Sequence, residues 1–424
     1  MDSPGPGART RVAVLGLGYV GLPLAREACR AGMDVVGYDI DTSAVKELSC
    51  GRSRVDDIPN DEVRTMLESG FLATSDASDL GSSRVYVICV PTPLSAERSP
   101  DLGCVKSAAD TISTYLMPGD LVVLESTTYP GTTEEVVAPV LQRSGLQAGQ
   151  DFHLAFSPER IDPGNMEYTF RNTPKVVGGV SPPSADAAYE FYAQVCDVVV
   201  VAKGTREAEL AKLLENTYRH VNIALVNEMV QLSHELGVDL WDSIRCAATK
   251  PFGFQPFYPG PGVGGHCIPI DPNYLSHHVR SRLGQSFRFV ELAQDINNEM
   301  PSYVSRRAQD VLNLQAKAAN GSKILLVGVT YKANVSDQRE SPAQPLAESL
   351  LSLGAQVSYW DPHVAEWAVG GQWLPRVTEQ RRASKFDLAI LLQPHRELDL
   401  PALLDDAKQI LDTRGRLPAP AHRL

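Results

Sequence analysis

The sequence predicts an α/β protein in which two Rossmann-like α/β domains are joined by a helical middle domain with a long central helix. Three observations support this fold class. Residues 11–16 form a β-branched run that ends in glycine, residues 205–236 contain neither glycine nor proline, and residues 323–329 form another apolar run with a late glycine. A length of 424 residues suits two or three domains of roughly 150 residues each. We place these domains at 1–202, 203–318 and 319–424.

The first domain alternates strand-like and helix-like segments. The run at 11–16 is followed by a helical pattern from Val20 to Ala31 and then by a strand at 34–40. Alternating β and α elements predict a parallel sheet with helices on both faces. Further apolar runs lie at 84–90, 121–126, 153–158 and 175–179.

One long helical stretch dominates the middle domain. Residues 205–236 carry apolar side chains at helical spacing, and Gly237 follows the run as a C′ glycine would. At roughly 1.5 Å per residue this helix would be about 50 Å long, a length that usually joins domains or subunits. We expect a second helical stretch at 286–318, after a loop rich in glycine and proline at 251–272.

The third domain repeats the architecture of the first without an obvious repeat in sequence. The strand at 323–329 is followed by a helix at about 342–353 and by strands at 355–361, 386–392 and 409–413. This order predicts another α/β unit.

Composition and charge exclude several classes of protein. Hydrophobic residues make up 43% of the chain, which is enough for a core, and a net charge of −12 argues against a nucleic-acid-binding surface. No run of ~18 apolar residues is present, and the first residues lack the apolar core of a signal peptide. The seven cysteines are scattered without CxxC spacing. We therefore expect no metal, no disulfide framework, no membrane partner and a cytoplasmic location.

Gly16, Gly18 and Gly21 form a GxGxxG motif between a strand and a helix. In such a motif the first glycine allows a tight turn, the second admits a pyrophosphate and the third lets helix and strand pack closely. Asp39 closes the second strand, where its carboxylate would bind ribose hydroxyls and repel a 2′-phosphate. NAD is therefore favoured over NADP. The alternative is a tight turn in a flavodoxin-like sheet that binds no dinucleotide.

Residues at the ends of neighbouring strands extend this cofactor site. Tyr19 and Val20 complete the glycine turn, while Pro91, Thr92 and Thr127 follow two later strands. Because ligands of a parallel sheet bind at the carboxyl ends of its strands, we expect these residues at the cofactor. Prolines in such positions can also be simple strand terminators.

Cys267 is the candidate nucleophile. It lies in a loop rich in glycine and proline, beside Gly265 and His266 and four residues before Asp271, whereas Cys89 lies in an apolar strand. A thiol in a loop that brings the backbone close to a ligand can act by covalent catalysis. The alternative is a packed structural thiol.

Seven ordered blocks of the sequence resemble the nucleotide-sugar 6-dehydrogenases of the UDP-glucose/GDP-mannose dehydrogenase superfamily. The blocks are GLGYVGLPLA (16–25), CVPTP (89–93), ESTTYPGTT (125–133), SPERIDPGN (157–165), AKLLENTYRHVNIALVNE (211–228), GPGVGGHCIPIDP (260–272) and GVTYKANVSDQRESP (328–342). The resemblance implies a net four-electron oxidation of the carbon-6 primary alcohol of a UDP-sugar to a carboxylate. Two NAD are consumed, and a thiohemiacetal and then a thioester form on Cys267.

The resemblance also assigns catalytic roles. Lys212 and Asn216, one helical turn apart, would stabilise the oxyanion at carbon 6. Asp271 would act as a base or orient the hydrolytic water. Thr127 and Glu159 would order the water network, with Glu159 a candidate base for hydrolysis. Without the resemblance, Lys212 would be assigned to a solvated helix face and Glu159 to the surface.

Other residues are expected to contact the ligands. The resemblance places Arg339, with Lys332, on a loop that the family uses at the sugar-nucleotide and cofactor sites, and arginine suits bidentate phosphate contact. Arg414 is expected to contact the cofactor, although it could also be an ordinary tail arginine. Family members dimerise through the helical middle, so we expect a homodimer. The substrate set comprises Glu159, Arg160, Lys212, Asn216, Phe257, Tyr258, Gly262 and Lys332.

The block at 157–165 bears on the identity of the sugar. UDP-glucose members typically carry PEFLxEG where this chain has PERIDPG, and PERxxPGN is similar to members that act on 2-acetamido sugars. Residues 249–262 resemble the UDP-N-acetylglucosamine group more than the N-acetylmannosamine group. We therefore expect a UDP-N-acetylglucosamine 6-dehydrogenase, with UDP-glucose or dTDP-glucose as alternatives. Alternatives of another class are a non-redox nucleotide-sugar binding protein and a two-electron hydroxy-acid dehydrogenase.

Overall fold

The structure divides into two compact units. The first unit comprises residues 1–215 and 273–281, and the second comprises residues 216–272 and 282–424. Whether the helical segment forms a third, separate domain stays a prediction. The computed structural model describes residues 9–55, 57–93, 100–162, 165, 167–265 and 268–424, without the side chains of 380–382.

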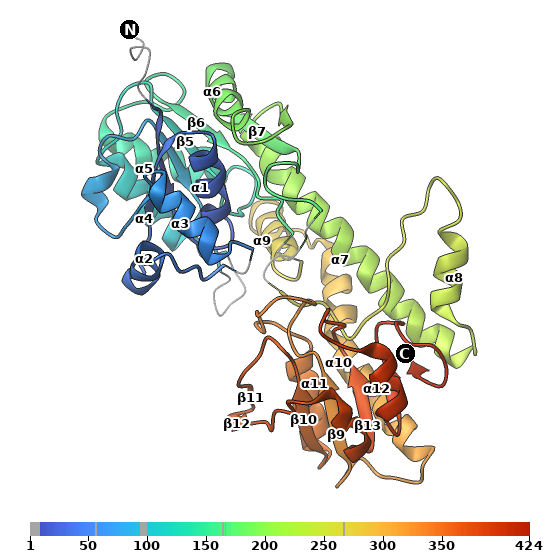
Figure 1. Cartoon of the computed structure of the whole chain (residues 1–424). Helices are drawn as coiled ribbons and strands as arrows, with labels where there is room; N and C mark the ends of the chain where they lie inside the picture. Colours follow the sequence, from blue (N-terminus) through green and yellow to red (C-terminus); the bar gives the residue numbers. More distant parts are fainter. Residues whose placement is uncertain (1–8, 56, 94–99, 163–164, 166, 266–267) are drawn as a thin grey trace. The chain divides into compact units, whose positions relative to one another are not determined.

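An eight-stranded sheet forms the centre of the first unit (Figure 1). Its strand order is β3-β2-β1-β4-β5-β6-β7-β8, so the first six strands have the 3-2-1-4-5-6 order of dinucleotide-binding sheets. The order reverses between β1 and β4, which marks the expected ligand edge. The strands are β1 (Arg11–Leu15), β2 (Asp34–Tyr38), β3 (Leu72–Thr74), β4 (Val85–Ile88), β5 (Leu121–Leu124), β6 (His153–Phe156), β7 (Lys175–Gly179) and β8 (Val199–Val201).

One neighbouring pair departs from the parallel arrangement that we expected. β7 runs antiparallel to β6, with Ala155 opposite Gly179 and Phe156 opposite Gly178. Among the described residues, no helix lies between these two strands. Parallel strands need a long crossover, usually a helix. The chain therefore re-enters the sheet in the opposite direction.

Helices cover both faces of this sheet, as the alternation of core side chains shows. Val12 and Val14 of β1 belong to one apolar cluster, while Ala13 and Leu15 belong to another. The first cluster includes side chains of α1, α3 and α6, and the second includes side chains of α4 and α5. The helical elements are α1 (Gly21–Arg30), α2 (Thr42–Ser49), α3 (Asn60–Glu68), η1 (Ala77–Leu80), α4 (Gly103–Ser113), η2 (Thr133–Val137), α5 (Ala138–Leu141), η3 (Gln142–Ser144) and α6 (Pro182–Tyr192).

The long helix predicted from the sequence is confirmed as α7 (Thr205–Glu235). Gly237 ends it with a φ of 66°, its N–H donating to the His234 carbonyl, while the Val238 N–H donates to the Ser233 carbonyl. These two bonds form a Schellman motif, which satisfies the last carbonyls of the helix. The following helices are α8 (Leu240–Ala247), α9 (Asp271–Leu283) and α10 (Arg288–Asn313), of which α8 and α9 were not predicted.

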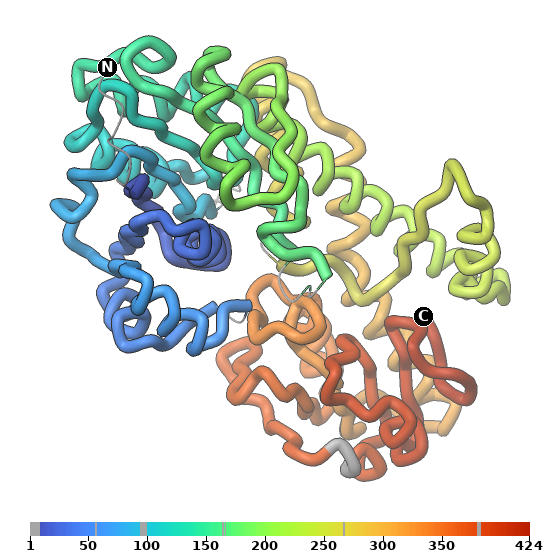
Figure 2. The backbone as a smooth tube through the Cα atoms, turned by 45° about the horizontal axis from the view of Figure 1, so that its top comes forward, coloured from blue at the N-terminus to red at the C-terminus, as the bar shows by residue number. Residues whose placement is uncertain are grey.

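A five-stranded parallel sheet forms the core of the second unit, in the part of the chain that is coloured orange to red in Figure 2. Its order is β10-β9-β13-β14-β15, so this sheet also reverses direction beside its first strand. The architecture of the first unit is thus repeated, as predicted. The elements are β9 (Lys323–Val327), α11 (Ala343–Ser352), β10 (Gln356–Trp360), β11 (Ala368–Val369), β12 (Gln372–Trp373), η4 (Gln380–Lys385), β13 (Leu388–Leu391), α12 (Leu400–Asp406), β14 (Ile410–Asp412) and β15 (His422–Arg423).

Within the described part of the chain, none of the helices combines the length and the apolar character needed to cross a membrane.

Candidate active site

The glycine turn of the first unit has the geometry that a dinucleotide requires. Gly16 has a φ of 95°, and a Cβ there would lie 2.7 Å from the Cys89 carbonyl oxygen. A Cβ on Gly21 would lie 1.9 Å from the Gly16 oxygen, whereas a Cβ on Gly18 would meet no atom within 4 Å. The first and third glycines are therefore fixed by the fold, and the second leaves open space beside the backbone.

The start of α1 presents no side chain of its own that would repel an anion. Val20 occupies the N-cap without a side-chain hydrogen bond, and the first turn carries no acidic residue. The positive end of the helix dipole is therefore not neutralised by an acidic residue of the first turn, which favours a pyrophosphate there. These features, together with the space beside Gly18, fit a bound dinucleotide.

Asp39 lies at the end of β2, as predicted. Its Oδ2 accepts a hydrogen bond of 2.8 Å from the Leu17 N–H, and its Oδ1 accepts one of 2.9 Å from the Asp41 N–H. The carboxylate is half-buried. It is thus held against the glycine turn with capacity left for ribose hydroxyls.

Pro91 and Thr92 follow β4, and Thr127 follows β5, at the same edge of the sheet. The Ser126 hydroxyl donates to the Val90 carbonyl oxygen at 2.7 Å, which joins the two loops. The Tyr274 hydroxyl donates to the Thr92 carbonyl oxygen. The backbone of both loops is therefore fixed beside the glycine turn.

Lys212 is buried on α7 and donates a hydrogen bond to the Thr127 hydroxyl. It is therefore not on a solvated helix face. One turn further along α7, in the second unit, Asn216 donates a hydrogen bond of 2.6 Å to Oδ2 of Asp271, the first residue of α9. Both of these side chains are also buried.

Glu159 is buried as well, which excludes the surface alternative. Its Oε1 accepts hydrogen bonds from the backbone N–H groups of Arg160 and Ile161, and its Oε2 lies 3.5 Å from Lys175 Nζ. The Arg160 guanidinium lies 2.8 Å from a Glu215 oxygen and donates to the Pro174 carbonyl oxygen. The sequence analysis missed Lys175, although a lysine opening an apolar strand was a visible signal.

Sequence reasoning also missed Glu209 on α7. Its buried carboxylate accepts hydrogen bonds from the N–H groups of Gly131 and Thr133 and from the Thr133 hydroxyl. Burial raises the pKa of Glu209 to about 7, although these donors favour the ionised form. Glu209 ties the loop after β5 to α7, three residues before Lys212.

The thiol loop of the second unit packs tightly up to Gly265. The Gly260 N–H donates to Oδ1 of Asn227 at 3.0 Å. A Cβ on Gly264 would lie 2.6 Å from the Glu340 carbonyl oxygen, and one on Gly265 would lie 2.6 Å from the Tyr331 ring. These glycines let the loop approach residues 331–342. Cys267 and His266 themselves lie outside the described residues.

The expected wall residues of this loop have different environments. The Phe257 ring meets the Tyr218 ring edge-on at 5.7 Å, while Tyr258 is exposed. Gly262 has a φ of 129°, and a Cβ there would lie 3.1 Å from Pro342. Gly262 therefore cannot carry a side chain without strain.

A second glycine turn follows β9. Gly328 has a φ of 79°, its N–H donates to the Trp360 carbonyl at 2.8 Å, and a Cβ there would lie 2.5 Å from the Gln393 carbonyl. Asp361 occupies the place that Asp39 has in the first unit, since its Oδ2 accepts from the Val329 N–H at 2.7 Å. This turn repeats the geometry of the first.

Asp361, however, is fully buried, and His395 lies against it. Asp361 Oδ1 accepts from the His363 N–H, and its Oδ2 lies 3.1 Å from His395 Nε2. Nδ1 of His395 accepts from the Asn334 N–H. Nitrogen and oxygen atoms of His363, His395 and Glu397 lie within 4.8 Å of one another, but both His395 nitrogens are already engaged. This cluster is therefore poorly suited to hold a metal ion.

The predicted basic residues of the second unit lie where the sequence placed them, on loops. Lys332 and Arg339 follow β9, and the Arg339 guanidinium pairs with Asp337 at 2.8 Å. Arg414 follows β14, donates to the Leu392 carbonyl oxygen at 2.7 Å and lies beside Gly260. Burial lowers the pKa of Arg414 to about 10, so it is still a cation at neutral pH. Arg414 is therefore not an ordinary tail arginine.

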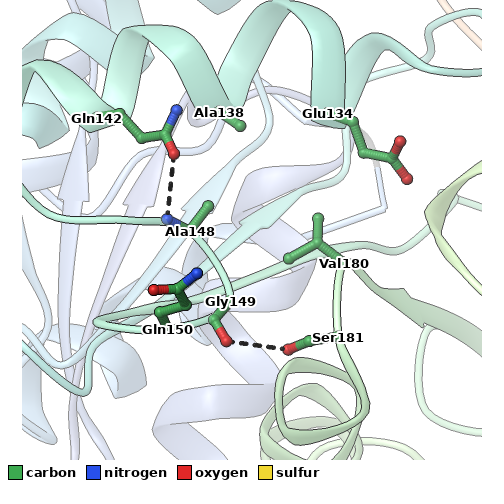
Figure 3. A pocket seen from close by; sticks show the side chains of 8 residues that line it. All are labelled: Glu134, Ala138, Gln142, Ala148, Gly149, Gln150, Val180 and Ser181. Carbon is green, nitrogen blue, oxygen red and sulfur yellow. Dashed lines mark hydrogen bonds between the residues drawn. The ribbon is translucent and has the colours of Figure 1, made fainter.

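A cavity of about 390 Å³ in the first unit carries none of the expected residues (Figure 3). It lies before β6 and after β7, at the amino end of β6 and thus at the opposite edge from the glycine turn. Its lining is Glu134, Ala138, Gln142, Ala148, Gly149, Gln150, Val180 and Ser181.

Comparison with known proteins gives consistent matches along the chain. The UDP-glucose/GDP-mannose dehydrogenase family models match residues 10–196 (NAD binding domain), 206–299 (central domain) and 325–419 (UDP binding domain). UDP-N-acetyl-D-mannosamine dehydrogenase of Pyrococcus horikoshii is 36% identical over 84% of each chain. UDP-N-acetyl-D-glucosamine 6-dehydrogenase of Salmonella typhi is 34% identical over 96% of this chain and 97% of that protein. The solved structure of the Pyrococcus horikoshii UDP-D-ManNAc dehydrogenase superposes with a TM-score of 0.87, at 32% identity over 97% of each chain.

Proposed function

The chain belongs to the UDP-glucose/GDP-mannose dehydrogenase family and is an NAD-dependent UDP-sugar dehydrogenase, and we propose that it oxidises carbon 6 of UDP-N-acetylglucosamine. The sequence PERIDPGN at 158–165 carries this proposal, because it departs from the UDP-glucose pattern next to Glu159 and Arg160. UDP-N-acetylmannosamine is the second candidate, since a relative named for it and a relative named for UDP-N-acetylglucosamine are both 36% identical to this chain.

The proposed reaction is a four-electron oxidation. The alcohol, one water and two NAD⁺ give the carboxylate, two NADH and three protons. NAD supplies the hydride acceptor in both oxidation steps. Cys267 adds to the aldehyde to form a thiohemiacetal, which is oxidised to a thioester and then hydrolysed. Holding the aldehyde on sulfur keeps it from escaping between the two oxidations.

In the first unit, Lys212 and Thr127 are the proposed groups around the reacting oxygen. The Lys212 ammonium is buried, so its charge acts in a medium of low dielectric and would stabilise an oxyanion strongly. Its hydrogen bond to Thr127 fixes its direction. Glu159 is the proposed base for thioester hydrolysis.

In the second unit, Asn216 and Asp271 are proposed to act together. The hydrogen bond between them orients the Asn216 amide, which would donate to the oxyanion, and holds the Asp271 carboxylate, which would accept a proton or orient water. The tight packing of Gly264 and Gly265 supports a fixed backbone leading to Cys267.

The remaining residues are proposed as binding residues. NAD is bound by the turn at 16–21, by Asp39 and by the loops carrying Pro91, Thr92 and Thr127, with Arg339 and Arg414 as further contacts. The substrate is bound by Arg160, Phe257, Tyr258, Gly262 and Lys332 together with the catalytic set. Arg160 already pairs with Glu215. An anionic group of the substrate would therefore be bound by the guanidinium N–H groups of Arg160 that Glu215 does not occupy.

We also propose a homodimer formed through α7. In the second unit this helix exposes Leu225, Met229 and Leu232 on one face, and Leu236 follows at its end. Such an apolar stripe is typical of an interaction surface. The expected result of sedimentation analysis is a dimer for the wild type and a monomer for Leu232→Glu; a monomeric wild type would contradict the proposal.

The six described cysteines are free thiols, which supports a reducing, cytoplasmic location.

One experiment tests the substrate and the chemistry together. Initial rates of NADH formation are compared on UDP-N-acetylglucosamine, UDP-N-acetylmannosamine and UDP-glucose, and NADH is counted per acid formed. We expect UDP-N-acetylglucosamine to be fastest and the ratio to be two. A higher rate on another sugar reassigns the substrate, a ratio of one excludes the thioester route, and no NADH with any sugar would favour a non-redox binding protein. Cys267→Ser should form no acid.

A further inference from the structure

Three charged side chains of the first unit form a buried triad between the loops that follow β5 and β6. The Lys175 Nζ lies 2.9 Å from Oε1 of Glu125 and 3.5 Å from Oε2 of Glu159. All three side chains are at most 8% exposed. With two carboxylates and one ammonium ion, the triad carries a net charge of −1 when fully ionised.

The surroundings hold the Lys175 ammonium in place. Its Nζ lies 4.9 Å from the centre of the Phe170 ring and 5.2 Å from that of Tyr192. The Tyr192 hydroxyl donates a hydrogen bond to Glu125. Burial alone would lower the pKa of Lys175, but the two carboxylates outweigh burial and raise it, so the lysine stays charged.

Other titratable groups packed against the triad are uncharged at neutral pH. Burial raises the pKa of Cys89, after β4, and of Tyr192, on α6, well above their usual values. Burial raises the pKa of Cys196, which follows α6, to about 12. The Arg160 charge, next to Glu159, is paired with Glu215. The charge on Glu159 is therefore balanced mainly by Lys175.

We propose that Lys175 is a positioning residue that aims Glu159 for hydrolysis of the thioester. The inference rests on the proposed role of Glu159. In that step water attacks the thioester carbon, a C–O bond forms, the C–S bond breaks, and the proton of water passes to Glu159 while the thiolate leaves. Oε1 of Glu159 is fixed by two backbone N–H groups, so the orientation of the second oxygen depends on Lys175.

Lys175 also links the two loops that carry Thr127 and Glu159. Glu125 stands two residues before Thr127 at the end of β5, and its carboxylate forms an ion pair with Lys175 at 2.9 Å. Without the ammonium ion, no cation would stand between the two buried carboxylates, and they would repel each other. A Glu159 side chain rotated away from its position could not accept the proton of water.

The first test compares Lys175→Met with Lys106→Met, which replaces an exposed lysine on α4. For Lys175→Met we expect a rapid burst of two NADH per active site, followed by steady-state turnover about 100-fold below the wild type. Intact mass should show the acyl group on the protein. Lys106→Met should behave like the wild type. Loss of the burst together with turnover, or turnover at the wild-type rate, would overturn the proposal.

A charge-balanced variant guards against misfolding. Lys175→Met/Glu125→Gln keeps the net charge of the triad at −1, because one buried ion pair is removed as a whole. We expect this variant to keep the burst of two NADH and the slow steady-state turnover, because Glu159 has lost the group that aims its second oxygen. Lys175→Arg should restore turnover. Turnover at the wild-type rate in the double variant would refute the positioning role.

The number of NADH formed per acid by the wild type distinguishes a failure of this inference from a failure of the proposed function. If the wild type does not yield two NADH per acid, the proposed function fails whatever the variants do. If it does, and Lys175→Met still turns over normally, only the role of Lys175 is excluded.

Discussion

Two glycines of the turn after β1 should separate the effect of packing from the effect of ligand binding. In Gly21→Ala the new Cβ would stand 1.9 Å from the Gly16 oxygen, whereas ordinary contact begins at 3.4 Å. Helix and turn must therefore move apart by about 1.5 Å, the difference between these values. Such overpacking costs about 1–3 kcal/mol, which corresponds to a fall in melting temperature of roughly 2–12 °C.

Gly18→Ala should behave differently, because its Cβ meets no protein atom within 4 Å. We expect its melting temperature to stay at the wild-type value. The methyl group would, however, occupy the space where a pyrophosphate approaches the backbone. Losing one charge-assisted hydrogen bond, worth about 1.5–3 kcal/mol, raises the Kd for NADH by about 10- to 100-fold.

Thermal unfolding measures the melting temperature, and titration of NADH fluorescence measures the Kd for NADH. Both are measured on the same samples, and each variant is the control for the other. We expect Gly21→Ala to lose both stability and affinity, and Gly18→Ala to lose affinity alone. Wild-type affinity in Gly18→Ala would refute the assignment of this turn to the dinucleotide. An unchanged melting temperature in Gly21→Ala would refute the packing argument.

Three further changes test other contacts. Burial raises the pKa of Glu209 from 4.5 to about 7, so its contribution to stability is present below pH 4.5 and is lost as pH rises through 7. The free energy of unfolding, measured by urea denaturation, should fall between pH 4.5 and 8 by up to about 3 kcal/mol more in the wild type than in Glu209→Gln; parallel pH curves would contradict this. Lys212→Met should reduce kcat by about 100- to 1,000-fold and leave the Kd for NADH unchanged, so an unaltered kcat would exclude the oxyanion role. Gly265→Ala places a Cβ 2.6 Å from the Tyr331 ring and should reduce turnover by about tenfold, with partial recovery in Gly265→Ala/Tyr331→Leu; no loss of turnover would show that the thiol loop tolerates displacement.

The sequence was sufficient wherever a local pattern has one structural solution. Glycines at 16, 18 and 21 after a β-branched run permit few conformations other than the observed turn, and Asp39 lies at the strand end where the spacing placed it. Likewise, an uninterrupted run of helix formers followed by Gly237 gave α7 and its end.

Features that depend on contacts distant in sequence were missed. α9 (Asp271–Leu283) has weak amphipathic character, so its periodicity did not distinguish it from the preceding loop. β7 runs antiparallel to β6 because the connection between them contains no described helix, and no single residue in the sequence indicates this direction. Lys175 and Glu125 are 50 residues apart in the chain, and only the fold brings their charges together. The surroundings of Cys267 stay a prediction.

Asp361, whose two oxygens are already bonded, differs from Asp39 in what it can still bind. Of the two glycine turns that the structure describes, one leaves its strand-end acid able to take a ribose diol, and in the other His395 and backbone N–H groups occupy that acid fully. In the proposed four-electron reaction, a dinucleotide site at the first turn would have to exchange NADH for NAD⁺ between the two oxidations. The proposed covalent bond to Cys267 would hold the half-oxidised sugar during that exchange, whereas a hydrogen-bonded aldehyde could leave.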